Sequence, residues 1–446
     1  MKRTLLTDLI LLLLGCLSFM NSAQAVPPIE EAKLDSGLRI LLMEAHAVPM
    51  VSMQLTLPSG SRFDADGKGG TANLLATMLT DHTKKHGREA WATLLDAEAI
   101  QLGASANRDG LSLSLTVLKE VLPAGMSAFS EALLTPGWSS KRFSLIKENA
   151  ISSARKSLEE PGVRASEATS RLLFPNHAYG HRPNGTPESL NRLKLADLKT
   201  LYLDQVKPHN AILAVSGDIT MPELLKLLAP ALADWKGAPK QSLFDISKAD
   251  SVHGITKQIE MQTTQTLSQL VRLGPARRDA DFFPAFVLNH LLGGGGFGSR
   301  LMEEVREKRG LVYGVYSYFI PLATSGPFII TLQTRADQAE EAENVVRSVL
   351  QRLNNGEISS NDLNNSKANL IGSFAQRMDS NRERVGLMSM IGFYLMPLDY
   401  LQVWTHKVES VTLTDIKIAA KAYLDPKQWN LLRVGPQSSG KGETAP

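Results

Sequence analysis

The sequence lacks several features that would place it in a functional class at once. It has a single cysteine, Cys16, near its amino terminus, so a chain cleaved after residue 25 would have neither a disulfide nor thiol chemistry. An excess of one charge is also missing, because 48 Lys and Arg balance 45 Asp and Glu to a net charge of +3. Without a basic stripe, we expect no nucleic-acid partner.

The first 25 residues have the pattern of a targeting segment. Lys2 and Arg3 precede an apolar run from Leu9 to Leu14, and Ala23–Ala25 is a small-residue cleavage site. The apolar run is too short for a membrane-spanning helix, so we expect a cleaved signal peptide over 1–25 and no stable span in the mature chain. This predicts export to the periplasm of a Gram-negative-type bacterium. The alternative is a lipoprotein signal, since Cys16 follows Leu-Leu-Gly.

An internal repeat gives the clearest indication of architecture. At 446 residues the chain is too long for one typical core. Residues 190–217 and 408–435 match without a gap at an offset of 218, and each predicts a helix, a proline turn and a buried strand. The matching pairs are Leu195 and Leu413, Asp197 and Asp415, Lys199 and Lys417, Pro208 and Pro426, and Gly217 and Gly435. We therefore predict an α+β protein of two homologous lobes, each with a mainly antiparallel sheet packed with helices.

Periodicity predicts the elements of the first lobe. Alternation at 51–57 indicates a half-buried strand, with further strands at 38–44 and 111–118. Helices are expected at 70–83, 88–102, 120–134, 139–159 and 163–174. The predicted domains are a lobe at 26–235, a polar linker at 236–255, a second lobe at 256–436 and a flexible tail at 437–446.

Four consecutive glycines, Gly293, Gly294, Gly295 and Gly296, interrupt an apolar helical pattern. Glycine permits positive φ and close approach of another backbone, so the run predicts a loop that contacts a peptide. The alternative is a flexible hinge between two helices.

Arg306 and Tyr313 follow seven residues apart. Arg306 belongs to a charged helix that Gly310 caps, and Tyr313 is expected to begin a strand over 311–320. A guanidinium and a phenol beside a glycine-rich loop suit the binding of a peptide carbonyl or carboxylate. The alternatives are a solvated helix charge for Arg306 and a core aromatic for Tyr313.

The stretch 294–317, GGGFGSRLMEEVREKRGLVYGVYS, resembles the second-half signature of the insulinase/pitrilysin family, which includes the mitochondrial processing peptidase subunits. The likeness extends over roughly residues 35–435. It implies two lobes that form a clam-like chamber. It also implies that Arg306 and Tyr313 hold the substrate backbone, with Gly293–Gly296 nearby.

The zinc motif of that family is lost. Its peptidases carry H-x-x-E-H on a helix, where two His and a distant Glu bind zinc and the motif Glu activates water. In register, Asn73 and Thr77 stand at the His positions, Ala76 at the catalytic Glu and Ser153 at the third ligand. Neutral amides and hydroxyls do not replace these ligands, so we expect no cofactor in this chain.

Two other His pairs have i, i+4 spacing. His82 and His86 are expected at a solvated helix end, and His177 and His181 in a loop rich in Pro and Gly. Neither pair has the company of a carboxylate or Cys that a zinc site needs, so neither is predicted to bind metal.

The resemblance implies a division of labour, because some family members work as heterodimers. The leading hypothesis is a non-catalytic, substrate-binding subunit of an exported metallopeptidase, paired with a relative that carries H-x-x-E-H and the zinc. The alternative is a stand-alone peptide-binding or envelope-assembly protein. A third hypothesis, an active peptidase with unorthodox ligands, requires tightly bound metal in this chain alone.

Overall fold

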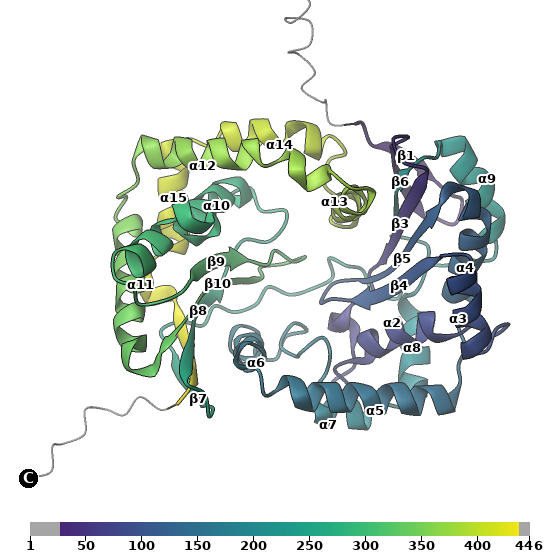
Figure 1. Ribbon diagram of the computed structural model, residues 1–446, viewed down its shortest axis with the longest axis horizontal. Coiled ribbons are helices and arrows are strands. Elements are labelled where there is room, and N and C mark those ends of the chain that lie inside the picture. Colours follow the sequence, from purple (N-terminus) through teal and green to yellow (C-terminus); the bar gives the residue numbers. More distant parts are fainter. Residues whose placement is uncertain (1–26, 437–446) are drawn as a thin grey trace, which may run out of the picture.

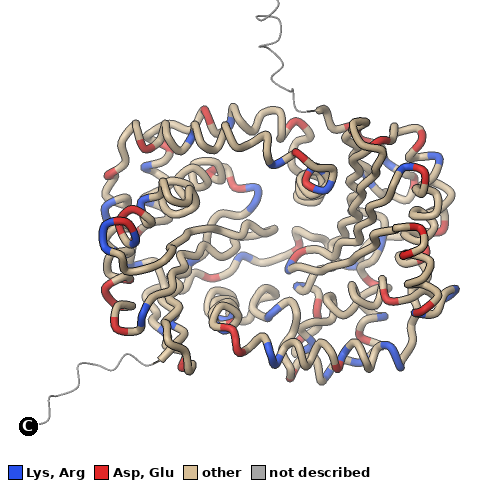
Figure 2. Tube along the Cα trace, in the orientation of Figure 1, with Lys and Arg blue, Asp and Glu red and all other residues tan. Residues whose placement is uncertain are grey.

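The computed structural model describes residues 27–436 and arranges them as two lobes of similar fold that face each other (Figure 1). The predicted signal peptide, Cys16 and the tail at 437–446 lie outside the described residues. Within 27–436 no helix is both long and apolar enough to cross a bilayer. Basic and acidic residues are interspersed along both lobes (Figure 2).

The first lobe is built on a six-stranded sheet with the order β1-β2-β6-β3-β5-β4. Its strands are β1 (Glu30–Lys33), β2 (Arg39–Glu44), β3 (Met50–Leu57), β4 (Gln101–Ala106), β5 (Leu111–Leu118) and β6 (Ile212–Gly217). Its helices are α2 (Thr71–Asp81), α3 (Arg88–Ala97), α4 (Leu122–Leu134), α5 (Ser140–Ser157), α6 (Pro161–Leu173), α7 (Pro187–Arg192), α8 (Leu195–Gln205) and α9 (Met221–Ala231).

The second lobe is built on a five-stranded sheet with the order β7-β11-β8-β10-β9. Its strands are β7 (Thr256–Glu260), β8 (Gln265–Leu273), β9 (Val315–Phe319), β10 (Pro327–Arg335) and β11 (Asn430–Gly435). Its helices are α10 (Phe282–Asn289), α11 (Ala339–Asn354), α12 (Ser360–Gly372), α13 (Asn381–Phe393), α14 (Tyr400–Glu409) and α15 (Leu413–Tyr423), with π-helical segments η3 (His290–Gly294) and η5 (Met302–Glu307).

The two sheets share one topology. Leaving out β1, the first order corresponds strand for strand to the second, and each sheet has one parallel pair, β2 with β6 and β7 with β11, among antiparallel neighbours. Gly217 and Gly435 end β6 and β11 with φ of 149° and 156°. A Cβ at either would press on backbone of the neighbouring strand, at Met50 or at Gln265. The predicted α+β fold with two homologous, mainly antiparallel lobes is confirmed.

Each lobe covers its sheet with a helix from the other lobe. Helix α13 of the second lobe packs on β3 and β6 of the first, and α6 of the first packs on β8 and β11 of the second (Figure 1). The cores are therefore continuous across the interface: Leu41 and Ile212 belong to the cluster that contains Met388 and Ile391, and Leu173 packs with the residues around Val271.

Two expected elements differ from the structure. The helix expected at 88–102 ends at Ala97, because Ala99 has a positive φ of 49°, and Gln101–Ala106 forms strand β4 on β5. The strand expected over 311–320 begins only at Val315, so Tyr313 lies in the turn before it.

Between α9 and β7 the chain has no helix or strand over 232–255. Arg62 attaches this segment to the first lobe, because its guanidinium donates hydrogen bonds to the carbonyls of Ser242, Leu243 and Asp245.

Candidate functional site

Helix α2 presents the residues that stand in the place of the zinc motif. Its first turn is held by Asp64, whose carboxylate accepts hydrogen bonds of 2.8 Å from the backbone N–H groups of Gly70 and Ala72. Its apolar side is buried in the core of the first lobe through Leu74, Leu75, Met78 and Leu79. This packing fixes the opposite side of the helix against α5.

The structure brings three of the four degenerate positions together. Asn73 and Thr77 from α2 and Ser153 from α5 line one cavity of about 390 Å³. Asn73 donates a 3.2 Å hydrogen bond to Asn184 Oδ1. Ala76, at the position of the catalytic Glu, does not line the cavity and is 1% exposed in the core. The pocket at the predicted zinc-motif positions therefore combines apolar and polar lining, and no Asp, Glu or His contributes to it.

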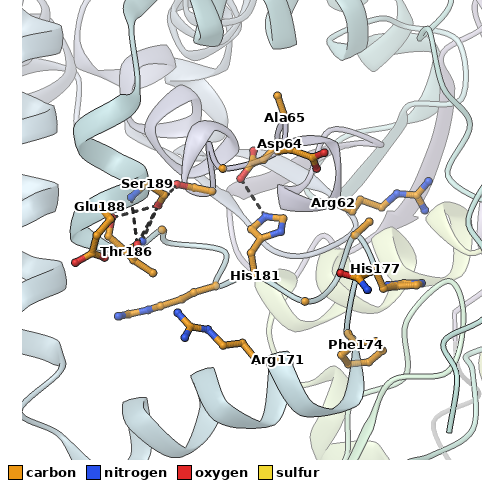
Figure 3. A pocket seen from close by; sticks show the side chains of 18 of the residues that line it. Arg62, Asp64, Ala65, Arg171, Phe174, His177, His181, Thr186, Glu188 and Ser189 are labelled. Atoms are coloured by element: carbon orange, nitrogen blue, oxygen red, sulfur yellow. Dashed lines mark hydrogen bonds and ion pairs between the residues drawn. The ribbon is translucent and has the colours of Figure 1, made fainter. Parts of the chain in front are cut away.

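A second, larger cavity of about 780 Å³ adjoins this region and is lined by residues 62–69 and 171–192 (Figure 3). His181 points toward Asp64, with His181 Nε2 3.4 Å from Asp64 Oδ2. Burial raises the pKa of Asp64, although the nearby His181 and the hydrogen bonds from the backbone N–H groups of Ala72 and Gly70 oppose that rise.

Ser189 also lines this cavity, but its hydroxyl serves a helix cap. Ser189 Oγ donates to the Gly69 carbonyl at 2.7 Å and accepts from the Thr186 backbone N–H at 2.8 Å (Figure 3). No hydrogen bond links it to His181 within 27–436, so these residues do not form a Ser–His–Asp arrangement.

Within residues 27–436 neither of the two His pairs belongs to a group of potential metal ligands. Over the described range no three His, Cys, Asp or Glu side chains gather as a group that could hold a metal ion. His82 is 8% exposed and contacts Asp81 Oδ2 at 2.8 Å, so the expectation of a solvated position was wrong. His177 lies in a loop, as predicted, with Nε2 3.0 Å from the Ser247 carbonyl.

The second lobe brings Arg306 and Tyr313 together and adds Phe297. The Arg306 guanidinium carbon lies 4.8 Å from the Phe297 ring centroid and 5.6 Å from that of Tyr313. The rings are strongly exposed, Phe297 by 71% and Tyr313 by 90%. The only ion pair of Arg306 within the described chain is with the exposed Glu307, at 2.8 Å. This cluster presents a cation held by two rings to the surface, which suits a carbonyl or carboxylate of a ligand.

The glycine run is more ordered than expected. The helix does not break at Gly293, because η3 continues α10 through Gly294. A Cβ on Gly293 would lie 2.6 Å from the Ser317 backbone nitrogen, so this glycine allows η3 to pack on β9. Only Gly296 has a positive φ, 61°, with open space around its Cα. The prediction of a loop therefore applies to the end of the run alone.

Sequence reasoning missed the exposed aromatic face of β9. Tyr316 and Tyr318 are 48% and 40% exposed, whereas the alternate residues Val315 and Ser317 are buried. The strand lies at the edge of its sheet. The alternation of β-branched and aromatic residues predicted the strand, and the same alternation was the signal for one aromatic side and one core side.

Comparison with known proteins identifies the family. A profile described as Insulinase (Peptidase family M16) matches residues 39–179, and one described as Peptidase M16 inactive domain matches residues 192–370. The chain belongs to the insulinase, or M16, family. One of its relatives is described as a non-peptidase homolog, and the positions predicted for the zinc motif hold Asn73, Ala76 and Thr77 in this chain.

Related proteins span the whole M16 fold. A crystal structure described as a peptidase M16 inactive domain from Pseudomonas fluorescens has a TM-score of 0.87 at 29% identity and covers 92% of this chain and 98% of that one. A Non-peptidase homolog, YmxG, of Helicobacter pylori is 25% identical over 431 residues, covering 95% of this chain and 96% of its own. An uncharacterized zinc protease of Streptomyces coelicolor is 23% identical, covering 94% and 92%.

Proposed function

We propose that this chain is the non-catalytic, substrate-binding subunit of an exported M16 metallopeptidase. It forms a heterodimer with a relative that carries H-x-x-E-H and the zinc ion. In this assembly the partner supplies the reaction, and the present chain holds the peptide. The periplasm is the proposed compartment, on the strength of the amino-terminal pattern alone.

The observation that carries the proposal is the Arg306 cluster. A chain that had kept only a scaffold role would have no chemical need for a guanidinium in cation–π contact with two exposed rings. The residues that would hold zinc are replaced, whereas those that would grip a substrate are presented at the surface. This asymmetry is what half of a split active site requires.

The test of substrate binding is Arg306→Ala in the purified heterodimer. Loss of a charge-assisted hydrogen bond of about 1.5–3 kcal/mol should lower kcat/KM for peptide cleavage roughly 10- to 100-fold. Arg335→Ala is the matched control, because the Arg335 side chain of the same lobe is 67% exposed and its only ion pair within residues 27–436 is with the exposed Asp337. Unchanged cleavage by an intact Arg306→Ala complex would remove the proposed role.

The test of pairing is native mass spectrometry of the protein purified from the envelope of its host. We expect a stoichiometric complex with an H-x-x-E-H relative and one zinc. A metal-free species without such a relative would favour the second candidate, a stand-alone peptide-binding protein. The Helicobacter pylori relative described as a non-peptidase homolog is compatible with either.

A further inference from the structure

Arg182 lies between the two cavities of the first lobe and lines both. Its Nη2 donates a 2.9 Å hydrogen bond to Ser157 Oγ at the end of α5. Its Nη1 is buried and has no hydrogen-bond partner among residues 27–436, and no carboxylate of that range lies within ion-pair distance of the guanidinium. A buried donor left unpaired costs about 1–3 kcal/mol, more when it is charged.

The lining of the 390 Å³ cavity has the opposite character to that of a cation site. Arg182 is its only charged residue, and no Asp, Glu or His lines it. Its other polar groups are amides and hydroxyls, from Asn73, Asn149, Asn184, Thr77, Ser153 and Ser157. Neutral donors around one guanidinium favour an anion.

The volume limits the kind of ligand. Small-molecule sites occupy about 300–1,000 Å³, so this cavity admits a short segment and not a folded protein. Leu74, Ile146 and Ala150 supply an apolar wall beside the polar groups. A peptide end has both characters, since it combines a carboxylate with an adjacent side chain.

We propose that the cavity at the predicted zinc-motif positions binds a peptide carboxylate, with the Arg182 guanidinium as its charged donor and Asn73 and Asn149 as neutral donors. The loss of the zinc ligands thus left a second binding site in the first lobe. This inference rests on the peptide-binding part of the proposed function and does not depend on a partner subunit.

The experiment is calorimetric titration of the whole chain with three acetylated alanine peptides of equal length. One has a free terminal carboxylate, one a terminal amide, and one a terminal amide with an internal Glu. We expect at least 10-fold tighter binding of a carboxylate-bearing peptide than of the uncharged amide. The free acid or the Glu peptide, whichever binds, identifies the source of the carboxylate. Equal binding of all three, or of none, would overturn the proposal.

Two variants test the assignment to this cavity. Arg182→Gln removes the charged donor. Asn149→Asp adds a negative charge, which would repel a carboxylate, at an exposed residue whose side chain makes no hydrogen bond within the described residues. Both should lose at least 10-fold in affinity, and Asn149→Asp decides the matter if Arg182→Gln does not fold. Unchanged affinity in a folded variant would place the binding elsewhere.

Matched controls separate local from general effects. Ser152→Asp makes the same change in net charge on α5 but does not line the cavity, and Arg171→Gln removes a guanidinium that lines only the larger one. Both should bind as the parent does. Because the titration uses the single chain, its failure leaves the Arg306→Ala result in the heterodimer unaffected, and the reverse also holds.

Discussion

At the scale of single residues, the glycine run shows that neighbouring glycines can be needed for different reasons. Gly293→Ala should destabilise the protein by about 1–3 kcal/mol, because the new Cβ would press on the Ser317 backbone and force η3 away from β9. The shift in the urea or thermal unfolding transition measures this.

Gly296→Ala and Gly298→Ala are its comparisons. Gly296 has open space but a φ of 61°, so alanine should cost about 1 kcal/mol through backbone strain alone. Gly298 has neither a positive φ nor a close neighbour, so alanine there should be neutral or slightly stabilising. Equal effects at all three positions would contradict the packing role of Gly293.

At this scale the sequence was sufficient to locate residues that occupy the positions of a known motif. Asn73, Thr77 and Ser153 were placed by their register against a known motif, and they do meet in one cavity. Arg182 was not found, because an arginine in a loop has no distinguishing pattern. Its significance depends on the partners it lacks, which only the fold determines.

At the scale of elements, a charge cluster holds η5, the segment that presents Arg306. Burial alone would raise the pKa of Glu304, but hydrogen bonds from Arg309, Lys308 and Arg352 outweigh it and lower the pKa to about 2. Since Arg352 belongs to α11, these interactions tie η5 to that helix.

The cluster predicts a pH dependence. A pKa lower in the folded than in the unfolded chain means that ionised Glu304 stabilises the fold above its ordinary pKa of 4.5, and that this contribution is lost as the pH falls toward 2. Glu304→Gln should therefore melt lower than the parent at pH 7, with a difference that shrinks toward pH 3. The melting temperature across this range measures it.

The control for this prediction is Asp337→Asn, which breaks an exposed pair with Arg335. It should show little difference at any pH. A Glu304→Gln deficit of the same size at pH 3 and pH 7 would contradict the electrostatic explanation.

Elements were predictable where the sequence repeats or alternates. Helix α15 and strand β11 begin 218 residues after α8 and β6, and strand β5 has the bounds that its alternation predicts. Strand β4 was missed because Gln-Leu-Gly-Ala-Ser-Ala has weak β propensity, and its pairing with β5 decides its conformation.

At the scale of the whole molecule, Asp109 joins the two lobes. This fully buried carboxylate accepts hydrogen bonds from Tyr179 of the first lobe, and from Tyr394 and the backbone N–H of Ala323 in the second, the last two at 2.9 Å. Burial of the two phenols, together with the neighbouring Asp109 carboxylate, raises the pKa of both Tyr179 and Tyr394, which therefore remain donors at neutral pH.

Asp109→Ala should lower the free energy of unfolding by about 2–4 kcal/mol, because it leaves donors of both lobes unpaired in the interior. Asp337→Ala, at an exposed position, is the control for this substitution.

Calorimetry should show one unfolding transition for the parent protein, since each lobe relies on a helix of the other. Two separate transitions in the parent would contradict this interdependence.

The exchange of α6 and α13 also sets an order of events during synthesis. The β3–β6 face is complete once Gly217 has left the ribosome, but α13 begins only at Asn381. At a synthesis rate of about 5–20 residues per second, that face remains without helix α13 for roughly ten to thirty seconds. During this interval Ile212 and Ala214 of β6, with Leu41 and Met43 of β2, lack the second-lobe side chains against which they pack. A chaperone that shields these residues is most useful within that window.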